Sequence, residues 1–340
     1  MKLASLTLSL LLAAALAPAA RAEETPKPAP RAGAKKAAEE EATARVERRV
    51  AATPDVVVEL SLESGDVVVQ GWERKEVRAY SGDAQRIELR HAEAAAAAGA
   101  SGQQPAASGP VSRVSVLVGA GTEEILPGEF GSGSIELNVP RGATVILHIQ
   151  SGDVVVSDVA EARIECASGD VDVSRVSRAV DVDCFSGNIS LDDARGPVRL
   201  RSLSGEVVAT NARPVSPRDD LQVNSTSGEI KLQGVTHTRV VAKTVSGGVS
   251  FEGALAPGGS YDLRTTSGDV TLMLPADASF KINARVVTGG EIITDFPIKG
   301  ATLPPTPKPE AQTRLTGTVG GGDADINLSA FNGTVHLRKM

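Results

Sequence analysis

Apolar and polar residues alternate along most of the chain, and the alternation is interrupted at short Ser-Gly pairs. When the chain is aligned on the Ser of each pair, apolar residues fall into columns on both sides of it. The column four residues before the Ser holds Leu147, Ile164, Val182, Leu200, Val223, Ala242 and Leu263. The column three residues after it holds Val154, Val171, Ile189, Val207, Ile230, Val249 and Val270. A period of two on each side of a corner predicts short β-strands with one buried face.

The Ser-Gly pair recurs often enough to identify a structural repeat. It stands at Ser64, Ser132, Ser151, Ser168, Ser186, Ser204, Ser227, Ser246 and Ser267, with weaker versions at Thr288 and Asn332. One repeat cannot bury its own apolar face, but stacked repeats can, because each strand pairs in parallel with the same strand of the next repeat. Glycine allows the backbone angles that each corner needs.

These features predict an all-β fold, a single-stranded parallel β-solenoid with coils of about 18–23 residues. An immunoglobulin-like sandwich would also have many short alternating strands, but its strands need not align residue for residue at a fixed period.

The two ends of the chain and two insertions depart from the repeat. Residues 1–22 have the features of a secretory signal peptide, with Lys2, then an apolar run, then the small-residue site Ala20-Arg21-Ala22. Residues 23–52 are rich in Pro, Ala and charge, which predicts a disordered or partly helical tether. We expect the β-solenoid repeat domain at 53–340, with a low-complexity loop at 92–110 and a Pro-rich loop at 303–312.

Several segments together resemble a known bacterial family. They are "SGDVVVQGWERKEV", "IELNVPRGATVILHIQSGDVVV", the run of Ser-Gly-Asp/Glu corners, "LPADASFKINARVVTGGEI" and "GTVGGGDADINLSAFNGTVHL". In this order they resemble the bacterial putative-adhesin domain family with β-strand repeats, a domain of unknown function. The resemblance covers about Pro54 to Leu337. It implies a single-chain β-solenoid at the cell envelope, and the family provides no catalytic motif to place on these residues.

The net charge and the aromatic content of the chain argue against some classes of function. The formal net charge of -7 argues against a nucleic-acid partner, because such proteins usually carry a basic stripe. Aromatic residues make up only 3% of the chain, so the core must be thin and aliphatic, and sugar-stacking platforms are scarce.

A mostly acidic column stands two residues after the corner Ser. It holds Asp66, Asp153, Asp170, Asn188, Glu206, Glu229 and Asp269. Carboxylates in a row suggest calcium binding, because hard cations prefer oxygen ligands. The alternative is a corner that favours small polar residues facing solvent. We prefer the alternative, because the glycine-rich nonapeptide of calcium-binding β-rolls is not repeated, and we expect no metal or other cofactor.

Histidines and cysteines are the residue types in this chain that could form a metal site or a disulfide. The four histidines have no spacing that suggests a metal site, and we expect each at the surface: His91, His148, His237 and His336. Cys166 and Cys184 hold the same column in successive repeats, so they should be neighbours on adjacent coils. The strand spacing of ~4.8 Å fits the Cα window of a disulfide, and export would favour the bond. Against the bond, side chains in register on parallel strands point the same way. The sequence therefore does not decide between a disulfide and two free thiols.

Together these features predict an exported, non-catalytic β-solenoid, periplasmic or at the cell surface, and not transmembrane after signal cleavage. It would act as an adhesin-like binding or spacer protein through its polar side walls, with an envelope protein or surface polymer as partner and no nucleic acid. Outward residues of neighbouring coils are candidates for the binding surface: Asp181, Asp183, Arg199 and Arg201.

The alternatives are a carbohydrate-active β-helix enzyme, a lyase or hydrolase, and an envelope protein that assembles end to end. An enzyme needs convergent carboxylates, whereas the repeat spreads the acids evenly.

Overall fold

The computed structural model describes residues 46–82, 86–91, 110–119, 131–300 and 313–340. All of them belong to one compact unit, Thr43–Met340. Within these ranges the chain forms 26 strands and no helix. In the same ranges, no helix has the length and apolar character needed to cross a membrane.

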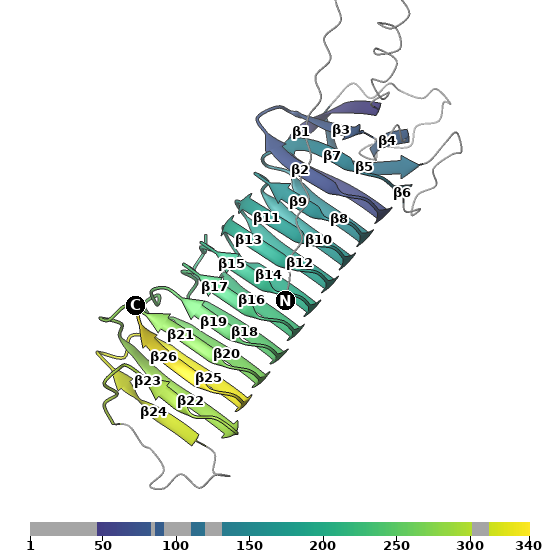
Figure 1. The fold of residues 1–340 in the computed structure, drawn as a ribbon. Coiled ribbons are helices and arrows are strands. Elements are labelled where there is room, and N and C mark those ends of the chain that lie inside the picture. The colour runs from purple at the N-terminus through teal and green to yellow at the C-terminus, as the bar shows by residue number, and fades with distance from the viewer. Residues whose placement is uncertain (1–45, 83–85, 92–109, 120–130, 301–312) are drawn as a thin grey trace, which may run out of the picture. The chain divides into compact units, whose positions relative to one another are not determined.

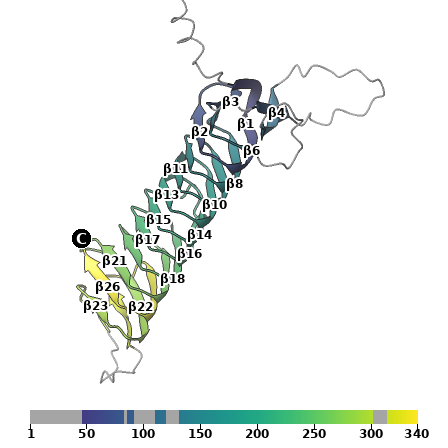
Figure 2. The same cartoon turned by 45° about the vertical axis from the view of Figure 1, so that its right-hand side comes forward.

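The central coils each contribute one strand to each of two parallel sheets, here called sheet A and sheet B (Figures 1 and 2). The sheet B strands are β8 (Thr144–Ser151), β10 (Glu161–Ser168), β12 (Ala179–Ser186), β14 (Val198–Ser204), β16 (Asp220–Ser227), β18 (Arg239–Ser246) and β20 (Ser260–Ser267). The sheet A strands are β9 (Val154–Ser157), β11 (Val171–Val176), β13 (Ile189–Ala194), β15 (Val207–Thr210), β17 (Ile230–Gln233), β19 (Val249–Glu252) and β21 (Val270–Leu274). Each strand pairs in parallel with the same strand of the next coil, so the predicted parallel β-solenoid is confirmed.

The predicted apolar columns form one continuous core between the sheets. Leu147 pairs with Ile164, Ile164 with Val182, Val182 with Leu200, and Leu200 with Val223. All five side chains are buried. The columns after the corner are buried in the same way in sheet A, so the alternation in the sequence fixes which face of each strand points inward.

The Ser-Gly corners explain why glycine recurs. At the corner of β12, Gly187 has a φ of 134°, which side chains rarely allow. A Cβ added to Gly187 would lie 2.0 Å from the carbonyl oxygen of Gly169 in the preceding coil. Glycine is therefore required both by the local backbone angle and by the close approach of the preceding coil.

At the two ends of the stack, the coils are not stacked in the order in which they occur along the chain. The N-terminal strands are β1 (Val46–Ser64), β2 (Val67–Trp72), β3 (Glu76–Ser81), β4 (Arg86–His91), β5 (Val111–Gly119), β6 (Gly131–Ser132) and β7 (Ile135–Pro140). The coil made by β1 and β2 lies between the coil of β5, β6 and β7 and the coil of β8 and β9. Strands β3 and β4 add antiparallel pairs at this end.

A similar insertion occurs at the other end. Its strands are β22 (Phe280–Thr288), β23 (Ile292–Thr294), β24 (Thr313–Val319), β25 (Asp325–Asn332) and β26 (Val335–Lys339). Strand β25 pairs with both β20 and β22, and β26 pairs with both β21 and β23. Strand β24 is antiparallel to β22. The expected pairing of each repeat with the next along the chain therefore holds in the centre and is wrong at both ends.

The predicted boundary between tether and repeat domain also changes. Strand β1 begins at Val46, so residues 46–52 are not part of a tether. The physical reason is that this segment pairs antiparallel with β3 and buries Ala52 in the core. The predicted signal peptide (1–22) and the remainder of the tether lie outside the described residues. So do nearly all of the loop predicted at 92–110 and all of the loop predicted at 303–312.

Candidate functional site

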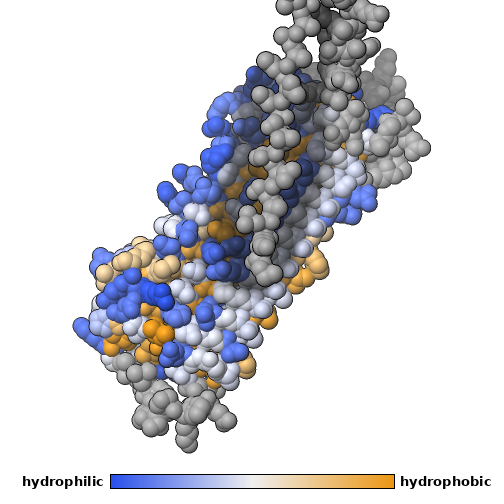
Figure 3. All heavy atoms as spheres, viewed as in Figure 1, coloured by the Kyte–Doolittle hydropathy of each residue, from blue (hydrophilic) through white to orange (hydrophobic). Residues whose placement is uncertain are grey.

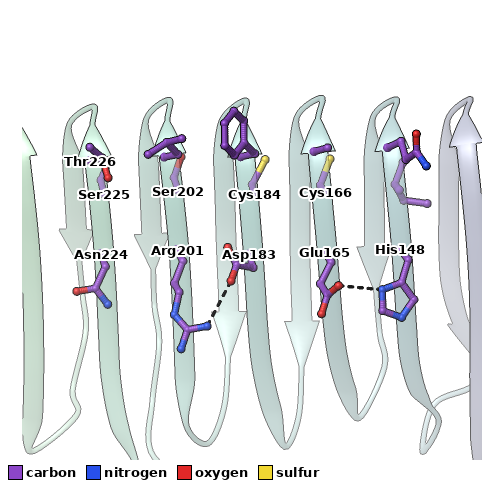
Figure 4. Close-up of a pocket in the computed structure, with 15 residues that line it drawn as sticks. His148, Glu165, Cys166, Asp183, Cys184, Arg201, Ser202, Asn224, Ser225 and Thr226 are labelled. Carbon is purple, nitrogen blue, oxygen red and sulfur yellow. Dashed lines mark hydrogen bonds and ion pairs between the residues drawn. The ribbon is translucent and has the colours of Figure 1, made fainter.

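A groove of about 640 Å³ lies on the outer side of sheet B, next to the Ser-Gly corners of β8, β10, β12, β14 and β16 (Figure 4). We call it the sheet B groove. Its lining residues are His148, Ile149, Gln150, Glu165, Cys166, Ala167, Asp183, Cys184, Phe185, Arg201, Ser202, Leu203, Asn224, Ser225 and Thr226. Because five successive coils contribute equivalent residues, the groove runs across the strands, along the direction of stacking.

One side of the groove is a row of polar side chains three residues before each corner Ser. In stacking order the row is His148, Glu165, Asp183, Arg201 and Asn224, and each is the register partner of the next. His148 Nδ1 lies 3.1 Å from Glu165 Oε2. Arg201 Nη1 donates to Asp183 Oδ2 at 3.3 Å. Figure 4 shows both pairs bridging adjacent strands. The row therefore places polar side chains in contact from strand to strand, with one ion pair between Asp183 and Arg201.

The other side of the groove is formed by the residues directly before the corner Ser. The strand alternation breaks there, because both this residue and the Ser face outward. Phe185 is 63% exposed and Leu203 is 39% exposed on neighbouring strands. Figure 3 shows that the face in view carries separate hydrophobic patches among polar residues. Large apolar side chains left in water beside polar ones are typical of a contact surface.

The floor of the groove is the stretch of each strand between these two rows, two residues before the corner Ser. The side chains at this position are buried on the inner face of the strands: Cys166, Cys184, Ser202 and Ser225. The same column holds Thr244 and Thr265 beyond the groove. Their hydroxyls donate to the carbonyls of Gly228 and Gly247 at 3.2 and 2.8 Å.

The structure confirms that Cys166 and Cys184 are register partners on adjacent strands. Both thiols are free, and both lie within reach of the Gly169 carbonyl, at 3.9 Å from Cys166 Sγ and 3.7 Å from Cys184 Sγ. The neighbouring Cys166 thiol and burial together raise the pKa of the Cys184 thiol.

The sequence comparison establishes the family at this point. The family model described as Toastrack DUF4097 matches residues 58–338. The chain belongs to the Toastrack DUF4097 family. The match takes in every strand that lines the groove, and it confirms the resemblance drawn from the sequence to a putative-adhesin domain of unknown function.

Two solved structures are similar to this Toastrack chain. One is a putative cell adhesion protein from Clostridium sporogenes ATCC 15579, which is 10% identical, with a TM-score of 0.23, over 87% of this chain and 100% of that chain. The other is a putative adhesin from Bacteroides fragilis NCTC 9343, which is 9% identical, with a TM-score of 0.31, over 87% of this chain and 97% of that chain. A comparison with curated proteins finds no match.

The acidic column after the corner has a structural role in this Toastrack domain. Asp153 Oδ1 accepts a hydrogen bond from the backbone N–H of Asp170, at 2.9 Å, and Asp170 Oδ1 accepts one from Asn188, at 2.8 Å. Asn188 Oδ1 accepts in turn from Glu206, at 2.9 Å. Each side chain thus receives the N–H of the equivalent residue in the next coil. Among the described residues, no group of three or more His, Cys, Asp or Glu is placed to hold a metal ion.

Some of the predicted binding residues and one of the histidines line the groove, and the others lie elsewhere. Asp183 and Arg201 line it, whereas Asp181 and Arg199 are register partners on the same face outside it. His148 faces the groove as the alternation predicted. The expectation that every histidine lies at the surface is wrong for His237, which is buried with its Nε2 2.8 Å from the Gly196 carbonyl. His237 lies between strands, where the column alignment assigned no position.

The apolar side of the groove and the His148–Glu165 pair were not predicted from the sequence. The signal was present in the alignment on the corner Ser. The column directly before the Ser contains Phe185 and Leu203, although an outward position would normally be polar.

Proposed function

We propose that this protein is an exported, non-catalytic binding protein of the cell envelope, and that the sheet B groove holds its partner. The partner class is another envelope protein or a surface polymer. The observation that carries the proposal is the combination in one groove of exposed apolar side chains, Phe185 and Leu203, with the paired polar side chains of the row. Binding surfaces combine apolar contact area with polar groups that fix orientation.

The polar row is suited to exchange its contacts for those of a partner. Arg201 and Asp183 are 52% and 55% exposed in their pair. Exposed ion pairs of this kind contribute only about 0–1 kcal/mol to stability. A partner that brings its own charges can replace the internal pairs at little cost to the fold, while the stacked strands hold the groups at fixed spacing.

The distribution of acids supports a binding role over a catalytic one. Glycan cleavage by the usual route needs two carboxylates on opposite sides of one scissile bond. Glu165 and Asp183 stand side by side in one row on adjacent strands, and each lies against a basic side chain of a neighbouring strand. The predicted signal peptide at 1–22 supports export.

The proposal is tested with the chain from Glu23 onward, immobilised and exposed to an envelope extract, followed by binding measurements with the purified partner. We expect the double variant Phe185→Ser with Leu203→Ser to weaken that binding at least about tenfold, which corresponds to 1.4 kcal/mol. The matched control is Val155→Ser, which removes an apolar side chain that is 39% exposed on sheet A. This control should bind like the unaltered protein.

Two outcomes would overturn the proposal. One is a partner whose affinity is unchanged by the groove variants and reduced by Val155→Ser. The other is cleavage in a panel of envelope polysaccharides that disappears when Glu165 or Asp183 is replaced by the corresponding amide.

A further inference from the structure

A row of exposed side chains on one edge of sheet B extends beyond the groove. Directly before each corner, in stacking order from β12 to β25, stand Phe185, Leu203, Thr226, Val245, Thr266 and Phe331. The apolar members of this row are 39–63% exposed. We call the row the apolar ridge. The steps between its strands, at ~4.8 Å each, give it a length of ~24 Å, which indicates a partner with a long face.

The polar row beside the apolar ridge carries an unbalanced negative charge on β10. Glu165 is 73% exposed, and its partner His148 is charged only when protonated. Asp183 and Arg201 form an ion pair and balance each other. When the imidazole is neutral, no cation within the row therefore compensates the charge of Glu165.

Lys243 on β18 supplies the opposite charge in the same row. It is the register partner of Asn224, and its side chain is exposed. Among the residues that the structure describes, none forms an ion pair or a hydrogen bond with the Lys243 ammonium group. On the next strand, Arg264 is paired with Asp262 and adds no net charge. The row thus holds an uncompensated anion on β10 and an uncompensated cation on β18.

We propose that a second copy of this chain occupies the sheet B groove, with the two stacks packed face to face and running in opposite directions. The inference rests on the proposed function, because it names the partner of the same groove. The sheet B strands stand side by side along the stack (Figures 1 and 2), so a two-fold axis parallel to the strands can relate two such faces. With the axis between β14 and β16, the strand direction is preserved and the stacking order is reversed. Strand β12 of one copy then faces β18 of the other, and β14 faces β16.

This symmetry places opposite charges and apolar side chains against each other. Lys243 of one copy lies opposite Asp183 of the other copy and next to Glu165, because β12 faces β18 and β10 adjoins β12. Phe185 lies opposite Val245 for the same reason. Each contact occurs twice, because a two-fold interface uses the same patch on both copies.

The same symmetry keeps like charges apart near the axis. Arg201 faces Asn224 of the other copy and Arg199 faces Gln222, because β14 faces β16. Like charges opposite each other would cost affinity.

The area of the face fits a reversible dimer. The strands from β8 to β25, at ~4.8 Å each and with about six residues of ~3.3 Å, present a face of roughly 750 Å². A standard interface buries about 800 Å² per partner. We therefore expect a dimer that forms as the protein concentration rises.

Sedimentation of the chain from Glu23 onward, over a range of protein concentrations, tests the proposal. We expect a monomer–dimer equilibrium that Lys243→Glu weakens at least about tenfold, because the new carboxylate faces Asp183 and Glu165. Glu165→Lys should weaken it in the same way. The double variant Glu165→Lys with Lys243→Glu should recover most of the affinity, because the two unbalanced charges are exchanged. Arg338→Glu is the matched control, since it makes the same charge reversal at an exposed position on β26 of sheet A and should leave dimerisation unchanged.

The apolar ridge supplies a second test. Val245 is not among the residues that line the groove. Val245→Ser should therefore weaken the dimer and leave the binding of a different partner in the groove unchanged, whereas Phe185→Ser with Leu203→Ser should weaken both. Thermal melting of each variant verifies that these surface changes leave the fold intact.

The outcomes distinguish this inference from the proposed function. A protein that stays monomeric at every concentration overturns the dimer, while an envelope partner lost with the Phe185→Ser, Leu203→Ser variant would still support the groove. A dimer that is unaffected by Lys243→Glu and Val245→Ser, or equally weakened by Arg338→Glu, does not form through this face and also overturns the inference. Glycan cleavage that is lost with Glu165→Gln in a protein that still dimerises would overturn the proposed function alone.

Discussion

At the scale of single residues, the Ser-Gly-Asp motif stacks one coil on the next. The glycine allows a backbone angle and a close approach that other residues prevent, and the side chain after it accepts the N–H of the next coil. In part of the stack, a hydroxyl two residues before the Ser donates to a glycine carbonyl of a neighbouring corner. These contacts give the acidic column a structural role.

Two causes make glycine necessary at the corners, the positive φ and the close approach of a neighbouring coil, and substitutions can separate them. We expect Gly187→Ala to lower the free energy of unfolding by about 3 kcal/mol or more, because backbone strain alone costs of the order of 1–3 kcal/mol and the added Cβ also meets the Gly169 carbonyl. Gly258 has a φ of 71° and no atom within 4 Å of an added Cβ. Gly258→Ala should therefore cost only about 1–2 kcal/mol, the strain of a left-handed residue. Urea unfolding of both variants measures the difference, and equal losses would contradict the role of the close approach.

Buried His237 predicts that stability depends on pH. Burial lowers the pKa of His237 below its ordinary value, while the nearby carboxylates Asp219 and Asp220 act weakly in the opposite direction. In the unfolded chain the imidazole takes up a proton near its ordinary pKa of about 6.5. As the pH falls below that value the unfolded state binds a proton that the folded state does not, so stability is lost.

We expect the urea midpoint to fall between pH 7.5 and pH 5.5, and His237→Gln to reduce that fall. The glutamine amide can still donate to the Gly196 carbonyl, which His237 Nε2 approaches to 2.8 Å. His148→Gln is the control, because His148 faces the groove. If the fall is the same in all three proteins, His237 is not its cause.

At the scale of strands, the central coils could be predicted from the sequence because each strand repeats the alternation of its neighbour. Leu147, Ile164 and Val182 occupy equivalent positions, and parallel pairing in register is the arrangement that buries all of them. The ends could not be predicted in this way. Strands β3 and β24 pair antiparallel, and β25 is separated in sequence from its neighbour β20 by the four strands β21 to β24. Such pairings follow from long-range packing, which a local period does not contain.

The groove could be predicted only in part for a related reason. Buried positions are fixed by the need to exclude apolar groups from water, but outward positions are free to vary. Asp183 and Arg201 were found because charges on adjacent coils fall opposite each other. Phe185 could be placed beside them only once the break in alternation before the corner was known.

The paired cysteines give a prediction about strands β10 and β12. We expect mild oxidation to join Cys166 and Cys184, with the two thiols losing two protons and two electrons to an oxidant such as diamide. Thiol titration of the denatured, unreduced protein should fall from two groups to none, with a mass loss of about 2 Da. A loop of this length should stabilise the fold by about 3 kcal/mol in the chain-entropy model. The variant Cys166→Ser is the control, and two thiols remaining after oxidation would exclude the bridge.

At the scale of the whole described stack, the two ends are closed by different means from the centre. At one end the outermost strands are β4 in sheet B and, in sheet A, the first residues of β1, which pair antiparallel with β3. At the other end the antiparallel strand β24 is outermost in sheet B, whereas the short parallel strand β23 is outermost in sheet A. Antiparallel strands therefore cover three of the four sheet edges, which leaves β23 as the parallel edge for end-to-end assembly. The outer side of sheet B also changes along the stack, from a row of His148, Glu165, Asp183, Arg201 and Asn224 at β8–β16 to a surface with three arginines, Arg264, Arg285 and Arg314, toward β24.

Because each coil contacts mainly its neighbours, a defect should have effects that depend on its place in the stack. Val182 lies on β12 in the centre, and Val286 lies on β22, next to the outermost strand β24; both are buried. Val182→Asp introduces an unpaired buried charge, at a cost on the order of 3–5 kcal/mol, and disrupts pairing on both sides. Hydrogen exchange should show lost protection in β10, β12 and β14, with a lower melting temperature for the domain.

The same substitution near the end should act locally. For Val286→Asp we expect lost protection in β22, β23 and β24, while the central strands keep theirs, because only the last coil separates from the stack. Val155→Asp is the control, since it places the same charge at a position that is 39% exposed. A surface change of this kind should alter stability by less than about 0.5 kcal/mol. If Val182→Asp and Val286→Asp reduce protection equally in every strand, the coils unfold as a single unit and the dependence on position is wrong.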